Sequence, residues 1–171
     1  MAQKADLFEL GRLALHPGEG RQLDLEVGLD SLEFGAQRYE PRPASVPVML
    51  DVARTMAGFS LRLRFEAALA GPCARCLEEA AKGVRVDARE VDQPSGGEEL
   101  RSPYVHDGAL DLRAWGRDAL ALALPEQILC TEECRGLCAI CGENLNEASD
   151  EHEHERPPDP RFEKLSELKL E

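Results

Sequence analysis

Cysteines are the residues of this chain whose type and spacing most directly predict chemistry. All six fall in short pairs, a first pair at Cys73 and Cys76, a middle pair at Cys130 and Cys134, and a last pair at Cys138 and Cys141. Zinc takes four ligands in a tetrahedron, and such short spacings let one turn of chain supply two thiolates at about 2.3 Å from the metal. Glycines at 136 and 142 flank the last pair and let backbone amides turn toward the sulfurs. The pattern therefore predicts structural zinc.

Two other interpretations compete with zinc. The cysteines could be buried without binding a metal, or a pair of them could be a redox dithiol. A redox pair usually opens a helix inside an alternating strand–helix chain, and this sequence shows no such alternation. Three pairs at knuckle spacing are also hard to obtain by chance. Zinc at such a site is worth roughly 10–16 kcal/mol at neutral pH, which is enough to fix a segment with little core of its own.

The spacing leaves two ligand sets open. If the first and last pairs bound one zinc ion together, they would form the usual zinc ribbon of two knuckles. The first pair with the middle pair would leave the last pair in need of two more ligands, which His152 and His154 in DEHEHE could supply for a second, Cys2His2 site. Two histidines in an acidic stretch are also typical of a solvated tether. We expect one zinc ion, and a second one under the latter pairing.

The first pair lies between two predicted strands. FSLRLRFEAAL at 59–69 alternates apolar with mostly polar residues, and GVRVDAREV at 83–91 alternates again. We expect the two strands to form an antiparallel hairpin whose tip spans residues 70–83. The hairpin would then carry Cys73 and Cys76 at its end.

The middle pair follows a predicted helix. Asp111 suits the N-cap position, and Pro125 ends the helical pattern. Gly116 lowers the helix propensity by about 1 kcal/mol relative to alanine. The expected apolar stripe consists of Leu112, Trp115, Ala119 and Leu122.

The remaining segments complete an α+β fold. Residues 22–28 and 46–52 read as strands, the second near a sheet edge because of Pro47, and residues 29–45 read as a turn-rich connection. We expect a mainly antiparallel β-sheet with one main helix, a zinc-knuckle region and a C-terminal tail. Residues 1–142 would form the β-rich domain, and 143–171 an acidic tether ending in a short helix. That helix would place Phe162, Leu165 and Leu168 on one side.

Composition limits the classes of function. The 171 residues include 33 Asp and Glu against 20 Lys and Arg, a net charge of −13, which disfavours broad binding to nucleic acid and favours a basic partner. The first residues do not resemble a signal peptide, and no apolar run approaches the length of a membrane span. We therefore expect a cytoplasmic protein with reduced thiols. No phosphate loop or nucleophile motif is present, so neither enzymatic activity nor a small-molecule substrate is expected.

Four segments together resemble the YceD family, the large ribosomal RNA subunit accumulation proteins. They are CARCLEE at 73–79, ALALP at 121–125, CTEECRGLCAICGENLN at 130–146 and DPRFEKLSELK at 159–169. The resemblance implies a bacterial or plastid factor needed for normal levels of 23S ribosomal RNA, with no catalytic residues to carry over. The family keeps the first knuckle in members that degrade the second, which favours Cys73, Cys76, Cys130 and Cys134 as one site.

Two kinds of partner reconcile this resemblance with the negative charge. Contact with RNA, or with another partner, would use a set of arginines on and near the hairpin: Arg62, Arg64, Arg75, Arg85 and Arg89. The same arginines could instead be ordinary cross-strand partners of Glu66 and Asp87. The acidic tail could alternatively neutralise a basic ribosomal protein and dock through Phe162, Leu165 and Leu168.

The expected function is that of a non-enzymatic ribosome biogenesis factor that supports synthesis, processing or stability of 23S rRNA. Its partner would be the precursor of the large ribosomal subunit. The alternative is a dedicated chaperone of a small basic large-subunit ribosomal protein that makes no direct RNA contact. A thiol-based redox or RNA-processing enzyme ranks last.

Overall fold

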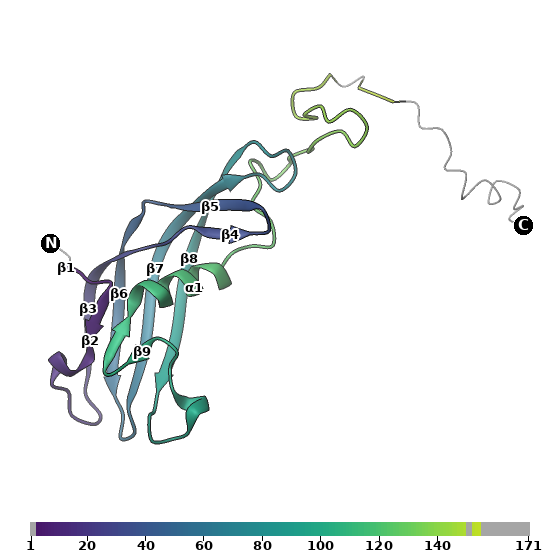
Figure 1. Cartoon of the computed structure of the whole chain (residues 1–171). Coiled ribbons are helices and arrows are strands. Elements are labelled where there is room, and N and C mark those ends of the chain that lie inside the picture. The colour runs from purple at the N-terminus through teal and green to yellow at the C-terminus, as the bar shows by residue number, and fades with distance from the viewer. Residues whose placement is uncertain (1–2, 150–151, 155–171) are drawn as a thin grey trace, which may run out of the picture.

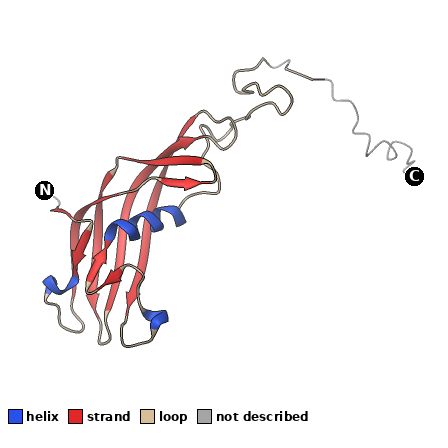
Figure 2. Cartoon of the chain, viewed as in Figure 1, coloured by secondary structure: helices blue, strands red, loops and turns tan. Residues whose placement is uncertain are grey.

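The computed structural model describes residues 3–149 and 152–154, and its strands greatly outnumber its helices (Figures 1 and 2). The strands are β1 (Gln3–Lys4), β2 (Leu7–Glu9), β3 (Gly20–Gly28), β4 (Leu32–Phe34), β5 (Gln37–Arg42), β6 (Ser45–Arg54), β7 (Phe59–Pro72), β8 (Glu79–Asp92), β9 (Val105–His106) and β10 (Ala109–Asp111). The helices are the short 3-10 turns η1 (Leu10–Leu13) and η2 (Glu98–Leu100) and the α-helix α1 (Leu112–Leu122). The predicted fold class, mainly antiparallel sheet with one main helix, is confirmed.

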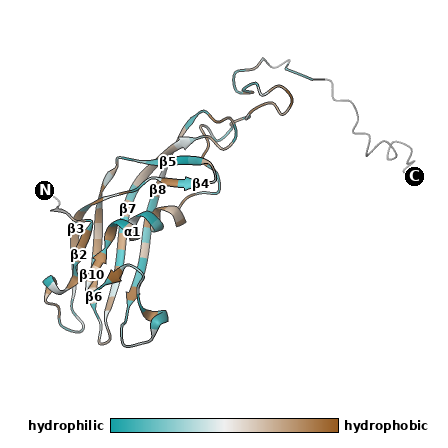
Figure 3. Cartoon of the chain, viewed as in Figure 1, coloured by the Kyte–Doolittle hydropathy of each residue, from teal (hydrophilic) through white to brown (hydrophobic). Residues whose placement is uncertain are grey.

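Most strands belong to one sheet in the order β1-β3-β6-β7-β5-β4, with β8 on the other side of β7. All its pairs are antiparallel except that of β1 with β3. Strands β2, β10 and β9 form a small second sheet. The alternating hydropathy along the long strands (Figure 3) leaves one face apolar, and α1 packs on that face.

The predicted hairpin is present, but its strands are longer than expected. The pairing of β7 with β8 runs from Phe59 opposite Asp92 to Pro72 opposite Glu79, so the tip spans only residues 73–78. The predicted tip of 70–83 was too long. Small residues at the ends of both strands interrupt the alternation of apolar and polar side chains, but their backbones continue the pairing of β7 with β8. Gly71 belongs to this stretch, and its missing side chain makes room for the ring of Tyr39, which would lie 2.2 Å from an added Cβ.

The prediction that 46–52 lies near an edge was wrong. Strand β6 pairs with β3 on one side and with β7 on the other. Pro47 lies opposite Glu26 of β3, and the pairing with β7 begins one residue later, at Val48. The proline therefore occupies the one part of the strand that has a single neighbour, where its missing N–H group is tolerated.

The prediction of a turn-rich connection over 29–45 was also wrong. This segment holds the β4–β5 hairpin, in which Gly35 has a φ of +62° at the turn. Leu32 and Tyr39 are buried in the core, and β5 pairs with β7 through residues 40–42. Pro41 obscured the strand because proline is rare inside a sheet, and β5 is held mainly by tertiary contacts that the local sequence does not encode.

Helix α1 begins at its predicted cap, where the Asp111 carboxylate accepts a hydrogen bond from the Ala114 N–H at 2.9 Å. Its buried side includes Leu112, Trp115 and Ala119, as predicted. The prediction that the next residue of the stripe is also buried was wrong. Leu122 is 88% exposed, and Leu120 is buried in its place. A Cβ at Gly116 would lie 3.2 Å from a methyl carbon of a core leucine, so this glycine permits close packing of the helix.

Several predictions concern residues that the structure does not describe. The C-terminal helix, with Phe162, Leu165 and Leu168, lies outside the described residues. The division of the chain after residue 142 stays a prediction. Among the described helices, none combines the length and apolar character that crossing a membrane requires.

Candidate metal centre

The structure gathers the predicted ligands into two clusters. One holds Cys73, Cys76, Cys130 and Cys134, and the other holds Cys138, Cys141, His152 and His154. Within each cluster, one ligand atom from each residue lies within 4.8 Å of the other three. The first pair of cysteines therefore meets the middle pair, as the family resemblance suggested, and does not meet the last pair.

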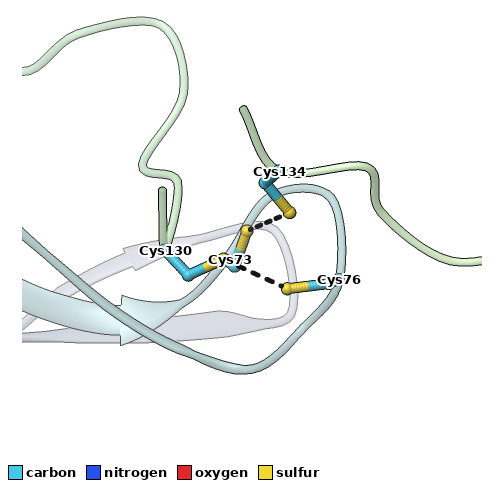
Figure 4. Close-up of side chains that lie close together, drawn as sticks. All are labelled: Cys73, Cys76, Cys130 and Cys134. Carbon is cyan, nitrogen blue, oxygen red and sulfur yellow. Dashed lines mark hydrogen bonds between the residues drawn. The ribbon is translucent and has the colours of Figure 1, made fainter. Parts of the chain in front are cut away.

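The first cluster joins the hairpin tip to the segment after α1. Figure 1 shows the β7–β8 hairpin reaching beyond the rest of the sheet toward this segment. In Figure 4 the four side chains converge, with Cys73 Sγ 3.7 Å from Cys134 Sγ and Cys76 Sγ 3.5 Å from Cys130 Sγ. A disulfide needs about 2.05 Å between its sulfurs, so these are separate thiols. A tetrahedral zinc ion with bonds of about 2.3 Å sets its sulfurs about 3.8 Å apart, which fits the distances in this cluster.

Hydrogen bonds to backbone carbonyls hold the two halves of the first cluster together. The Ala74 N–H donates to the Ile128 carbonyl at 2.8 Å, and the Arg75 guanidinium donates to the Cys134 carbonyl at 2.9 Å. Gly136 has a φ of +78°, and a Cβ there would lie 3.2 Å from the Arg75 carbonyl oxygen. The segment after the helix thus follows the hairpin tip closely, which brings thiols from distant parts of the sequence to one point.

The second cluster has the donor set of a Cys2His2 site. His154 Nε2 lies 3.3 Å from Cys141 Sγ and 3.2 Å from His152 Nε2, and His152 Nε2 lies 3.6 Å from Cys141 Sγ. Zinc–nitrogen bonds of about 2.0–2.1 Å give edges near these lengths in a tetrahedron. His152 Nδ1 lies 3.0 Å from the Glu143 carboxylate, the outer contact that fixes the ring of a metal-bound histidine.

The two Cys-x2-Cys turns share one hydrogen-bonding pattern, which the sequence spacing alone did not reveal. The amide two residues after the first cysteine donates to its sulfur at 3.4 Å, from Arg75 in one turn and from Ile140 in the other. The first cysteine's own amide donates to a carbonyl five residues on, at 2.7 Å in the first turn and 2.8 Å in the second. Both turns are therefore preorganised as metal knuckles.

A left-handed residue closes each knuckle. Gly142 has a φ of +77° after the last pair, whereas Leu77 has a φ of +65° after the first pair. Glycine adopts this conformation without a steric penalty, but a leucine does so at a cost. The first knuckle therefore depends more on its surroundings, which include the buried residues Ala70 of β7 and Ala80 of β8.

The hydrogen bonds to sulfur change the acidity of the thiols. Burial raises the pKa of Cys73, but backbone amides, those of Cys76 and Arg75 among them, outweigh it and bring the pKa from an ordinary 9.0 to about 6. The Cys141 amide, followed by the His152 side chain, brings the pKa of Cys138 to about 6. Burial raises the pKa of Cys76 to about 12. Each cluster thus holds a thiolate at neutral pH, the form that binds metal.

Asn146 is a site residue that sequence reasoning missed. Its side-chain amide donates to Cys134 Sγ at 3.4 Å, and its side-chain oxygen accepts from the Arg135 N–H at 2.8 Å. The contact with Asn146 is the largest cause of the lowered pKa of Cys134. Because Asn146 follows the second knuckle, it connects the loop of the second cluster to the first. The one feature of the sequence that could have indicated this role is that Asn146 ends the family motif GLCAICGENLN.

The five predicted arginines do not form one cluster. Arg75 lies at the metal centre, and the others lie on the open face of the sheet. Arg62 pairs with Asp87 through two hydrogen bonds of 2.7 and 2.6 Å, Arg64 pairs with Asp51 at 2.7 Å, and Arg85 pairs with Glu66 at 2.9 Å. Arg89 is exposed and has no ion pair among the described residues. Cross-strand pairing therefore accounts for most of this set.

Comparison with known proteins places this arrangement in a family. The sequence model of one protein family, the large ribosomal RNA subunit accumulation protein YceD, matches residues 61–169 of this chain, which include both clusters. Uncharacterized proteins from Mycobacterium tuberculosis and Mycobacterium bovis are each 36% identical over 107 residues, which cover 57% of this chain and 49% of the relative. The chain therefore spans about half the length of these two relatives.

An uncharacterized protein from Mycobacterium leprae is 30% identical over 151 residues, which cover 77% of this chain and 69% of the relative. No solved structure matches the chain. The family match covers well over half of the sequence, from near the start of β7 through both candidate metal sites. The chain belongs to the YceD family of large ribosomal RNA subunit accumulation proteins.

Proposed function

We propose that this protein is a ribosome biogenesis factor that supports the accumulation of 23S rRNA and acts as a scaffold without catalysing a reaction. The family match over residues 61–169 carries this proposal, because the family is named for the accumulation of large-subunit ribosomal RNA. The protein would act in the cytoplasm, on the precursor of the large ribosomal subunit. Residues 1–142 would be its β-rich domain, and 143–171 an acidic tether with a docking helix.

Zinc would have a structural role in this function. Cys73, Cys76, Cys130 and Cys134 would hold one ion, and the cluster at Cys138 would hold a second. Each set supplies four protein ligands, which fills the tetrahedron and leaves no open position for a water or a substrate. Closed coordination of this kind supports a scaffold, because catalytic zinc sites keep one position free.

A second candidate function is that of a chaperone for a basic ribosomal protein, without direct contact to RNA. The ion pairs of Arg62, Arg64 and Arg85 favour it, because a phosphate would have to compete with carboxylates already bound to these guanidinium groups. The net charge of −13 also repels RNA and attracts a basic protein. Under the first candidate, Arg89 would contact RNA together with Arg62, Arg64 and Arg85, which would exchange their carboxylates for phosphates.

One experiment separates the two candidates. The tagged full chain is recovered from cells with and without ribonuclease treatment, and the bound material is identified. A complex with a basic ribosomal protein that survives ribonuclease and dissociates in salt supports the chaperone. A complex lost on digestion supports RNA contact, and in that case Arg62→Glu with Arg64→Glu weakens association with pre-ribosomal particles.

A second experiment tests the function itself. In cells that lack the gene, we expect 23S rRNA to fall relative to 16S rRNA, and the wild-type chain to restore the ratio. A Cys76→Ser chain should fail to restore it, whereas Met56→Glu, an exposed change in the β6–β7 turn, should succeed. An unchanged ratio in the absence of the gene would refute the proposal.

A further inference from the structure

We propose that the groove between the free edge of β8 and α1 binds an extended segment of a basic protein as an added β-strand. This inference goes beyond the proposed function: it concerns a surface separate from both metal clusters and specifies a partner by its conformation and charge. It requires neither RNA contact nor a particular ribosomal protein.

The edge of β8 is open over most of its length. Strand β8 pairs with β7 on one side, and within the described residues no strand pairs with its other side. Among the described residues, no backbone group lies in hydrogen-bond contact with the backbone of β8 between residues 80 and 91 outside that pairing. Every second residue of such a strand turns its N–H and C=O groups outward. A long row of donors and acceptors is therefore free to pair with an incoming strand.

A groove of about 500 Å³ runs beside this edge. Residues 85–90 of β8 form one wall, and Tyr104, Trp115, Ala119 and Leu122 contribute to the other. Leu122 is 88% exposed, although it belongs to the apolar side of a helix that packs against β8. A strand edge beside an apolar helix wall is the arrangement used in β-strand addition, where backbone bonds supply affinity and side-chain pockets supply selectivity.

Among the charged residues that line the groove, Arg85, Asp87 and Arg89 lie on the open face of the sheet, whereas Glu90 lies on the face toward α1 and favours a basic segment there. Glu90 is partly buried and forms no ion pair among the described residues; its only hydrogen bond there is from the Ser102 hydroxyl at 3.2 Å. Asp118, on the helix beside the groove, is already paired with Arg117 at 2.7 Å and accepts a hydrogen bond from Tyr104 at 3.2 Å, so Glu90 is the carboxylate that a partner can neutralise. A lysine or arginine of the added strand would give Glu90 the cation that it lacks.

A second copy of this chain fits the edge less well. Each copy carries a net charge of −13, so two copies repel one another, whereas a basic segment is attracted over the same distance. On the face that carries Glu90, a second β8 would bring Lys82 but also its own Glu90 and Asp92, so it offers no net positive charge. The partner is therefore a different, positively charged chain.

The test uses the full, zinc-loaded chain and a synthetic heptapeptide of alternating lysine and valine, capped at both ends. Trp115 is the only tryptophan and lines the groove, so its fluorescence reports binding. Two further peptides carry backbone N-methyl groups, one on every valine and the other on every lysine. Only one edge of an added strand faces β8, so one methylated peptide should lose binding while the other retains it. Equal binding of both methylated peptides would overturn the proposal.

Paired variants test the walls of the groove. Leu122→Asn should weaken binding of the peptide by about tenfold, because an apolar contact is replaced by an uncharged polar group of similar size. Met56→Asn is the matched control, since Met56 is also 88% exposed and lies away from the groove. Glu90→Gln should weaken binding by about fivefold. Equal loss in both asparagine variants, tight binding of a glutamate–valine peptide, or a dimer of the chain that the peptide dissociates would each contradict the assignment.

Discussion

Replacing one ligand in each cluster should have very different effects on the stability of the fold. Cys76→Ser removes a ligand that joins the β7–β8 hairpin to the segment after α1. Cys141→Ser removes a ligand from a cluster whose members all lie between residues 138 and 154. With zinc supplied, we expect Cys76→Ser to lower the free energy of unfolding of the sheet substantially and Cys141→Ser to leave it nearly unchanged.

The size of the first effect follows from the loop that the metal closes. Cys76 and Cys130, in contact through their sulfurs, are 54 residues apart in the sequence. A cross-link that closes a loop of this length stabilises the folded state by about 4 kcal/mol in the chain-entropy account. For a protein of this size, about 1 kcal/mol shifts the melting temperature by roughly 2–4 °C. Cys76→Ser should therefore lower the melting temperature by roughly 8–16 °C.

Thermal unfolding followed by circular dichroism measures this difference, and elemental analysis establishes the zinc content of each variant. Both variants should retain one zinc ion of the two proposed for the wild type, so the loss of metal is matched and only its position differs. Wild-type protein in excess chelator should melt close to Cys76→Ser. Equal melting temperatures for the two serine variants would refute the reasoning, because the first cluster would then contribute nothing to the sheet.

Three further predictions concern the surroundings of the thiols. In metal-free protein, Cys138 should be alkylated with a midpoint near pH 6 instead of 9, and His152→Asn should move the midpoint upward, as residue-resolved mass spectrometry would measure. Because its folded pKa is depressed, the Cys138 thiolate stabilises the metal-free fold above pH 9, and this contribution is lost as the pH falls through about 6. Asn146→Ala should weaken zinc binding at the first cluster by about tenfold in a chelator competition, and an unchanged affinity would exclude a role for its contact with sulfur. Gly136→Ala should lower the unfolding free energy by about 1–2 kcal/mol in urea titrations, whereas Gly11→Ala, where an added Cβ meets nothing within 4 Å, should not.

Sequence patterns predicted the elements whose information is local. The alternation in β7 and β8 predicted the hairpin, and Asp111 predicted the start of α1, because hydropathic period and capping depend on neighbouring residues. The same logic failed at the β4–β5 hairpin, whose strands are short and interrupted by Pro41. It also failed at Leu122, because a helical stripe does not specify where the covering sheet ends.

The candidate site was predicted in part. The knuckle spacings identified the cysteines as ligands, and the acidic stretch after them contained His152 and His154, which the structure brings to the last pair. The role of Asn146 was not predicted, because an asparagine in a loop has many local uses and only its distance to a sulfur distinguishes this one.

By itself, the sequence determined which side chains can bind metal, where the long strands of the sheet lie and that the chain resembles the YceD family, since residue type, period and motif order are properties of the linear chain. Only the tertiary structure decided that Cys73 and Cys76 meet Cys130 and Cys134, and that most arginines of the sheet face pair with carboxylates. The tertiary structure also left the edge of β8 beside α1 without a partner strand in the part of the chain that the structure describes. These outcomes depend on the path of the chain between distant segments, and that path is set by burial of the common core and not by the residues adjacent to each site.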